Sequence, residues 1–116
     1  MSKKRLVFEL GQGTSLRRED YTKAAVRAVE NALWQNSLNV AEAFGFEKSD
    51  MIIDVLLGAQ EPERINIDQI KGIFPYGNVT IDPMFGGLDV NKPNNDGKTI
   101  IVTAAIIISF DMESIT

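Results

Sequence analysis

The chain has neither cysteine nor histidine among its 116 residues. Without cysteine, no disulfide and no thiolate metal site can form, which is compatible with a reducing cytosol. Without histidine, the chain lacks the usual general base near neutral pH, the commonest nitrogen ligand of zinc and any histidine-based triad. Acid–base chemistry would fall to carboxylates, lysines or tyrosines. We therefore predict no metal site and no cofactor.

Basic charge and long apolar segments are also scarce. Lysine and arginine number 12 against 16 acidic residues, which gives a net charge of -4. This argues against nucleic-acid or anionic-membrane binding, because both need a basic surface. The longest apolar run, residues 100–110, is well short of the roughly 20 residues of a membrane-spanning helix, and the N-terminal run is too short for a signal peptide. We expect one cytoplasmic domain over residues 1–116, with 44% hydrophobic residues to form its core.

The spacing of apolar residues predicts four strands. Residues 5–10 alternate, with Leu6, Phe8 and Leu10 on one face. Residues 51–59 and 99–110 are apolar on both faces, which is typical of interior strands. The segment 78–85 also alternates, but Pro83 places it at an edge or a bend.

Two helices are predicted between these strands. From Tyr21 onward the apolar spacing becomes helical, and Asp20 is suited to cap the helix that starts there. Lys23 and Arg27 lie on its polar face. A second, shorter helix is expected at about 67–74, with Asn66 as its cap.

The resulting order of elements is β-α-β-α-β-β, which indicates an α+β fold. We predict a two-layer α/β sandwich with one mixed four-stranded sheet and the helices on one face. The other face would then expose a set of apolar residues, namely Val7, Ile52, Leu56, Ile101, Ala105 and Ile107. A monomer seldom exposes so much apolar surface, so we expect a closed homo-oligomer.

The segment 11-GQGTSLRRE-19 is predicted to be a glycine-rich loop between the first strand and the first helix. It does not match the dinucleotide pattern G-x-G-x-x-G, because Leu16 stands where the third glycine belongs. Hydroxyls and arginines before a helix N-terminus nevertheless favour an anion. The predicted ligand-binding residues are Gly11, Gly13, Ser15, Arg17, Arg18 and the neighbouring Glu9. The alternative is a plain connection in which the hydroxyls bond their own backbone and the arginines face solvent.

A second candidate site consists of polar residues within the strands. These are Glu9, Asp54, Asp82 and Thr103. If they converge on the open face, Glu9 or Asp54 could serve an enzyme as an acid–base group. The alternative is that they lie near solvent or in an intersubunit hydrogen-bond network.

Motifs along nearly the whole chain resemble the Lin0512 family of conserved hypothetical proteins. They are ELGQGTSLRREDYTKAAVRAVENAL, the PYG turn followed by valine, GGL, and the AA of the last strand. The family motif is G-x-G-x-D-x-H-G after the first strand. Gly11 and Gly13 match it, but Ser15 replaces the aspartate, Arg17 the histidine and Arg18 the last glycine.

The resemblance implies a site in this loop in relatives, with its ionisable residues replaced here. The hypothesis that follows is an uncharacterised oligomeric protein that binds a small anionic molecule and has little or no catalytic activity. One alternative is an enzyme that uses Glu9 or Asp54. Another is a structural or regulatory subunit that forms a hetero-oligomer with a motif-bearing paralogue.

Overall fold

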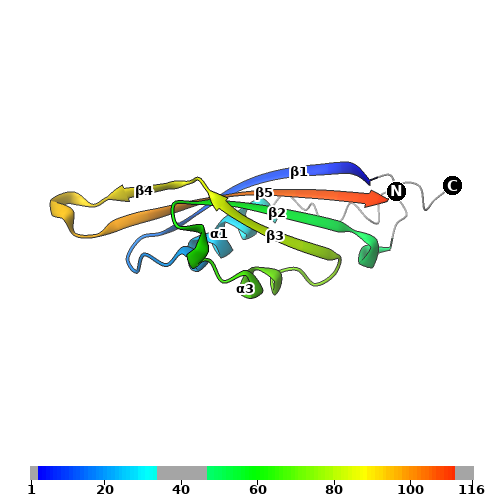
Figure 1. Ribbon diagram of the computed structural model, residues 1–116, viewed down its shortest axis with the longest axis horizontal. Helices are drawn as coiled ribbons and strands as arrows, with labels where there is room; N and C mark the ends of the chain where they lie inside the picture. The colour runs from blue at the N-terminus through cyan, green and yellow to red at the C-terminus, as the bar shows by residue number, and fades with distance from the viewer. Residues whose placement is uncertain (1–2, 34–46, 112–116) are drawn as a thin grey trace.

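The computed structural model describes residues 3–33 and 47–111. Figure 1 shows their helices and strands. The elements are β1 (Lys3–Ser15), α1 (Tyr21–Leu33), the 3-10 turn η2 (Lys48–Asp50), β2 (Ile52–Ala59), the 3-10 turn η3 (Pro62–Arg64), α3 (Ile67–Lys71), β3 (Asn78–Phe85), β4 (Leu88–Asn91), the 3-10 turn η4 (Pro93–Asn95) and β5 (Lys98–Asp111).

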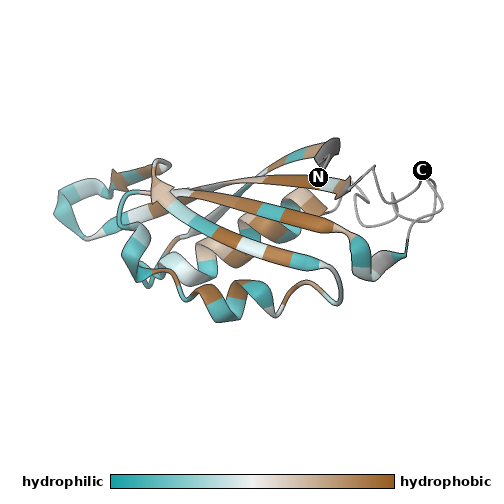
Figure 2. Ribbon diagram, turned by 45° about the vertical axis from the view of Figure 1, so that its right-hand side comes forward, coloured by the Kyte–Doolittle hydropathy of each residue, from teal (hydrophilic) through white to brown (hydrophobic). Residues whose placement is uncertain are grey.

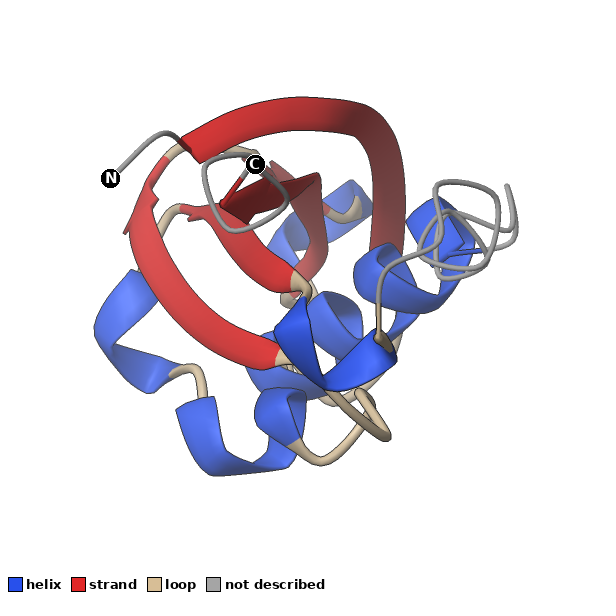
Figure 3. Ribbon diagram, turned by 90° about the vertical axis from the view of Figure 1, so that its right-hand side faces the viewer, coloured by secondary structure: helices blue, strands red, loops and turns tan. Residues whose placement is uncertain are grey.

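The strands form one mixed sheet in the order β1-β5-β2-β3, with β4 also paired to β5. Strand β5 is antiparallel to β1, β2 and β4, whereas β2 and β3 are parallel. Both helices lie on one face of the curved sheet (Figure 3). The predicted fold class is confirmed, as are the interior positions of β2 and β5 and the edge position of β3.

The strand β4 is the fifth strand, and the sequence did not predict it. Its four residues pair with residues 98–101 of β5. This pairing lies beyond the segment of β5 that pairs with β2, residues 103–109. As a result, β4 and the start of β5 form a hairpin that extends past β2, at the left of Figure 1.

The expectation that residues 11–19 form a loop was wrong, because β1 continues to Ser15. Gly11 and Gly13 lie within β1, directly under α1. A Cβ on Gly13 would be 2.1 Å from the carbonyl oxygen of Ala24, and one on Gly11 would be 2.3 Å from that of Ala28. These glycines are needed because the helix backbone packs against the strand backbone.

Because glycines occupy the helix-facing positions of β1, its apolar side chains lie on the other face. Phe8 is 50% exposed and Leu10 is 59% exposed. The register pairs Phe8 with Ile107 and Val7 with Ile108. The expectation that β1 presents Val7 to the open face was wrong, because Phe8 and Leu10 lie there instead. The side chain of Val7 itself lies outside the described part of the structure.

Helix α1 begins at Tyr21, as predicted, and Asp20 caps it. The Asp20 carboxylate accepts a hydrogen bond from the backbone N–H of Lys23 at 3.0 Å. The helix buries one row of small and apolar side chains against the sheet, namely Tyr21, Ala24, Ala25, Ala28, Val29 and Ala32. Figure 2 shows the facing strands β5 and β2 coloured mostly hydrophobic. The core therefore lies between α1 and the centre of the sheet.

Two side chains of α1 also reach the outer edge of β1. The carboxamide oxygen of Asn31 accepts a hydrogen bond from the backbone N–H of Gln12 at 3.1 Å. The guanidinium of Arg27 donates to the carbonyl oxygen of Thr14 at 2.6 Å. Both backbone groups are satisfied without a further strand.

Helix α3 is shorter than expected, since it ends at Lys71. Asn66 caps it, as predicted, by accepting a hydrogen bond from the backbone N–H of Gln69 at 3.2 Å. In the described part of the chain, no helix has the length and apolar character needed to cross a membrane.

Candidate functional site

The candidate site lies at the carboxyl ends of the parallel strands. Strands β1 and β2 are both antiparallel to β5, and β3 is parallel to β2, so all three end at the same edge. Ligands of open α/β sheets usually bind at such an edge. Here the segment 16–20 follows β1 and the segment 60–66 follows β2. The site is built from these segments and the first turns of α1.

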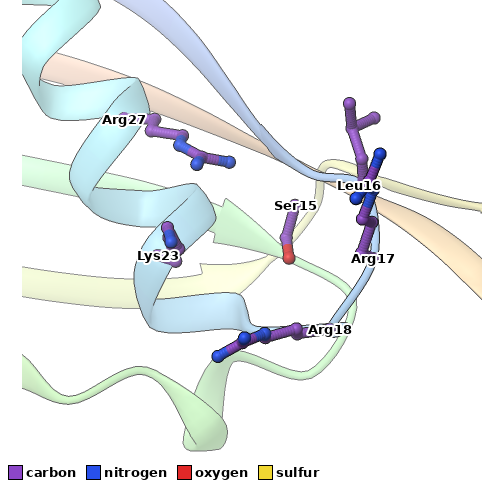
Figure 4. Close-up of a pocket in the computed structure, with 6 residues that line it drawn as sticks. All are labelled: Ser15, Leu16, Arg17, Arg18, Lys23 and Arg27. Carbon is purple, nitrogen blue, oxygen red and sulfur yellow. The ribbon is translucent and has the colours of Figure 1, made fainter.

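A basic cavity of about 350 Å³ lies between the 16–20 segment and α1. It is lined by Ser15, Leu16, Arg17, Arg18, Lys23 and Arg27. Figure 4 shows that Lys23 and Arg27 come from α1, whereas Arg17 and Arg18 come from the connection after β1. Two arginines from the connection and two cations one helical turn apart therefore surround one space.

Hydrogen bonds fix the backbone on which these cations stand. The hydroxyl of Ser15 is buried and accepts a hydrogen bond from the backbone N–H of Asp20 at 3.1 Å. Asp20 in turn caps α1, and Glu19 accepts from the backbone N–H of Lys98 at 3.1 Å. Arg27 is held by Thr14. The cavity is thus attached to both β1 and the β4–β5 hairpin.

The charges of the cavity are not compensated within the described residues. In residues 3–33 and 47–111, none of its four cations forms an ion pair with a carboxylate. Four like charges around one cavity repel one another, and the repulsion weakens only through solvent, salt or a bound anion. The cavity therefore favours an anion.

A second polar group, which we call the Tyr21 cluster, lies on the buried side of the same helical turn. It consists of Tyr21, Glu61, Asp89 and Lys98. The Tyr21 hydroxyl is within hydrogen-bonding distance of the Asp89 carboxylate and lies 2.9 Å from that of Glu61. The Lys98 ammonium lies 3.1 Å from Asp89 and 3.4 Å from Glu61. This cluster joins α1 to the end of β2 and to both strands of the hairpin.

Ionisation in the Tyr21 cluster follows from these contacts. Burial, followed by the hydrogen bond to Asp89, raises the pKa of Tyr21 above its usual range. The hydrogen bond from Tyr21 holds the pKa of Glu61 below its ordinary value. The hydrogen bond to Asp89 raises the pKa of Lys98 above its usual range. At neutral pH, Tyr21 thus keeps its proton and Lys98 its charge, so neither acts as a base.

The model of the Lin0512 family, described as a conserved hypothetical protein, matches residues 5–108. The chain belongs to the Lin0512 family. An FtsZ-like protein of unknown function from Nostoc punctiforme PCC 73102 has a similar solved structure, with 31% identity and a TM-score of 0.84. The match covers 96% of this chain and 98% of that one. No curated protein matches this chain.

The residues at the positions of the Lin0512 motif lie in two different places, under α1 and around the cavity. Gly11 and Gly13 are buried under α1 rather than in the connection. Ser15 lines the cavity, but its hydroxyl is bonded to the backbone. Arg17 and Arg18 line the cavity with exposed side chains.

The carboxylates predicted to converge on the open face do not all lie there. Glu9 pairs with Ile106, whose side chain is buried on the helix-covered face. It is also six residues from Ser15 along β1, roughly 20 Å at about 3.3 Å per residue. Asp54 lies on the open face, so the prediction that Glu9 and Asp54 share a site was wrong.

The other two residues of that set lie on the open face with Asp54. Asp82 is a diagonal neighbour of Asp54, because Asp54 pairs with Thr80 on β3. Thr103 pairs with Gly58, four residues further along β2 than Asp54. Across the described residues, there is no group of three or more acidic side chains placed to hold a metal ion.

Sequence reasoning missed two cations of the cavity and the whole Tyr21 cluster. Lys23 and Arg27 are four residues apart on the polar face of α1, so a helical projection beside the two loop arginines could have found them. The cluster has no comparable pattern, because Tyr21 and Asp89 are 68 residues apart in the chain. The pairing of β4 with β5 brings Asp89 close to Lys98, and the packing of α1 and of the segment after β2 brings Tyr21 and Glu61 to them.

Proposed function

We propose that this chain is a cytoplasmic protein that binds a small anionic metabolite in the basic cavity. One observation carries the proposal: four cations surround a single cavity without a carboxylate partner among the described residues, in a chain whose net charge is -4. Arginine forks bind phosphate and carboxylate groups through paired, charge-assisted hydrogen bonds. A ligand with two such groups could contact the connection and the helix together.

Binding is better supported than catalysis. Glu9 and Asp54, the carboxylates of the enzyme hypothesis, lie on opposite faces of the sheet. The cavity itself contributes cations and a serine whose hydroxyl already accepts a hydrogen bond. The raised pKa values of Tyr21 and Lys98 keep both groups protonated at neutral pH. The cations of the cavity are suited to hold an anion rather than to remove a proton from it.

The test is calorimetric titration with phosphate, pyrophosphate and citrate at constant ionic strength. We expect at least one anion to bind and the dissociation constant to rise about 10- to 100-fold in Arg17→Ala and Arg18→Ala, because each loses a hydrogen bond to a charged group. Lys71→Ala is the matched control, since it removes one exposed positive charge on α3. Binding of none of the three anions would contradict the proposal, as would an equal loss in the control.

A further inference from the structure

The face of the sheet opposite α1 is apolar and exposed. Five large hydrophobic side chains on it are well exposed: Phe8 50%, Leu10 59%, Met84 39%, Leu88 60% and Val90 48%. The register places them together, because Phe8 pairs with Ile107, Leu10 with Ala105 and Leu88 with Ile101. The apolar side chains therefore extend from β1 across β5 to β4, with the neutral polar residues Gln12, Thr14 and Thr103 between them.

Charge on this face is confined to one side. Among the described residues, its carboxylates are Asp54 and Asp82, which stand on β2 and β3. The part formed by β1, β5 and β4 carries apolar and neutral polar side chains from Phe8 to Val90. An apolar centre with polar groups at its rim is the usual arrangement of a protein interface.

The size of the face fits a dimer interface. From Thr99 to Ile107 the central strand β5 extends about 26 Å at about 3.3 Å per residue step. Beside residues 103–107 the sheet has four strands and is roughly 15–19 Å wide, and beside residues 99–101 it has three strands and is roughly 10–14 Å wide, at about 4.8 Å spacing. The flat area is thus about 400 Å², and side chains that project from it add to the accessible area. A standard interface buries about 800 Å² on each partner, whereas the largest apolar patch of a monomer is about 300–600 Å².

We propose that a second copy of this chain packs on the open face and forms a two-fold dimer centred on β5, with β1 and β4 at either side. Sheets pack face to face at about 10 Å when both present apolar surfaces of the same twist. A second copy provides such a surface with the same width and the same twist. A two-fold axis lets one surface serve both partners.

The proposed interface would also help to hold the cavity in place, because β4 contacts the helix that carries two of the cavity cations. Leu88 and Val90 face the open side, whereas Asp89 between them contacts Tyr21 at the start of α1. A partner that holds β4 in place thus also holds the contact of β4 with the helix that carries Lys23 and Arg27.

The first test is the mass of the native protein by sedimentation equilibrium and native mass spectrometry. We expect an assembly of two copies of the 12.8 kDa chain. Leu10→Lys and Val90→Lys should each give monomers, because each would bury a charge at the interface. Phe85→Lys is the matched control: Phe85 is 74% exposed and pairs across the ladder with Ala59, a residue of the helix-covered face. This variant should remain a dimer.

Cysteine cross-linking supplies an independent test, because the chain has no cysteine of its own. Ala105→Cys, at the centre of the open face, should be cross-linked between copies by a short bis-maleimide, because its two reactive ends can bridge the roughly 10 Å between packed sheets, which is too far for a direct disulfide. Lys71→Cys, on the surface of α3, should not. This measurement decides the question if Leu10→Lys and Val90→Lys fail to fold.

Three results would overturn the proposal. The first is a monomer at about 100 µM. The second is a dimer that keeps its mass in Leu10→Lys and Val90→Lys and does not cross-link through Ala105→Cys. The third is a chain that stays monomeric alone and associates only with a motif-bearing relative, which would assign the face to a hetero-oligomer.

Discussion

Two groups of charged side chains flank the first turn of α1, and they differ in how their charges are balanced. In the Tyr21 cluster, Lys98 lies between two carboxylates and every member has a partner. In the basic cavity, Arg17, Arg18 and Lys23 have no carboxylate partner among the described residues. The carboxylates of the Tyr21 cluster pair with Lys98, and Glu61 pairs also with Arg64, whereas the cations of the cavity have no such pairs among the described residues. This difference is why we assign binding to the cavity and a structural role to the cluster.

The largest effect is expected from Gly13→Ala, which disrupts both groups at once. The new Cβ would lie 2.1 Å from the carbonyl oxygen of Ala24, so α1 has to move away from β1. We expect unfolding free energy to fall by about 3 kcal/mol or more, or the chain not to fold. Denaturant titration measures this. Gly72→Ala is the control, because its Cβ would meet no atom closer than 3.5 Å, and it should change stability by less than about 1 kcal/mol.

The next largest loss of stability is expected from Asp89→Ala, which changes the Tyr21 cluster and leaves the side chains of the basic cavity in place. Asp89→Ala leaves the Tyr21 hydroxyl and Lys98 without their main partner, and the Asp89 side chain is only 13% exposed. We expect a loss of about 2 kcal/mol or more in thermal or denaturant unfolding. Asp96→Ala removes an equal charge from the exposed tip of the hairpin and should cost less than about 0.5 kcal/mol. Equal effects of the two variants would show that the cluster adds no stability.

A smaller effect is expected from alkaline pH. The pKa values of Tyr21 and Lys98 are raised in the folded chain, so the unfolded chain loses these protons first. Their contribution to stability is complete below the unfolded pKa values of about 10 and is lost as pH rises through the folded values. Unfolding measured between pH 8 and pH 12 should show no decline from these groups at first and a decline that begins at about pH 10. It should be shallower in Tyr21→Phe, and an unchanged slope would contradict the assignment.

The smallest effect on stability should come from the cavity. Arg18→Ala removes one of four like charges and no ion pair within the described residues. We expect unfolding free energy to change by less than about 0.5 kcal/mol, with a slight gain at low salt. Melting curves at low and high salt measure this. A loss of unfolding free energy as large as that of Asp89→Ala would mean that the cavity cations have structural partners, and the two groups would then not differ in how their charges are paired.

Much of the fold was predictable because local chemistry determined it. Asp20 and Asn66 are caps recognisable from sequence, and the apolar residues on both faces of β2 and β5 identified these strands as interior. Gly11 and Gly13 led to the wrong expectation of a loop, because a glycine that allows a helix backbone to pack closely on a strand cannot be told in sequence from a glycine of a turn. Strand β4 is too short to show a period.

The candidate site was only partly predictable. Ser15, Arg17 and Arg18, which composition indicated because they lie close together in sequence and precede a helix, line the cavity, and their role in binding stays a prediction. Glu9 was assigned wrongly, since a bulge between Arg5 and Val7 and the glycines of β1 determine its face. The Tyr21 cluster depends on contacts between distant strands, which a single sequence does not reveal.

The hydrogen bonds from α1 to the outer edge of β1 have a consequence for aggregation. An edge strand with free backbone groups can accept a strand of another molecule, and repeated strand addition produces fibrils. At this edge, Asn31 already accepts from the N–H of Gln12, and Arg27 already donates to the carbonyl of Thr14. An incoming strand would have to break both bonds, so this part of β1 resists open-ended polymerisation.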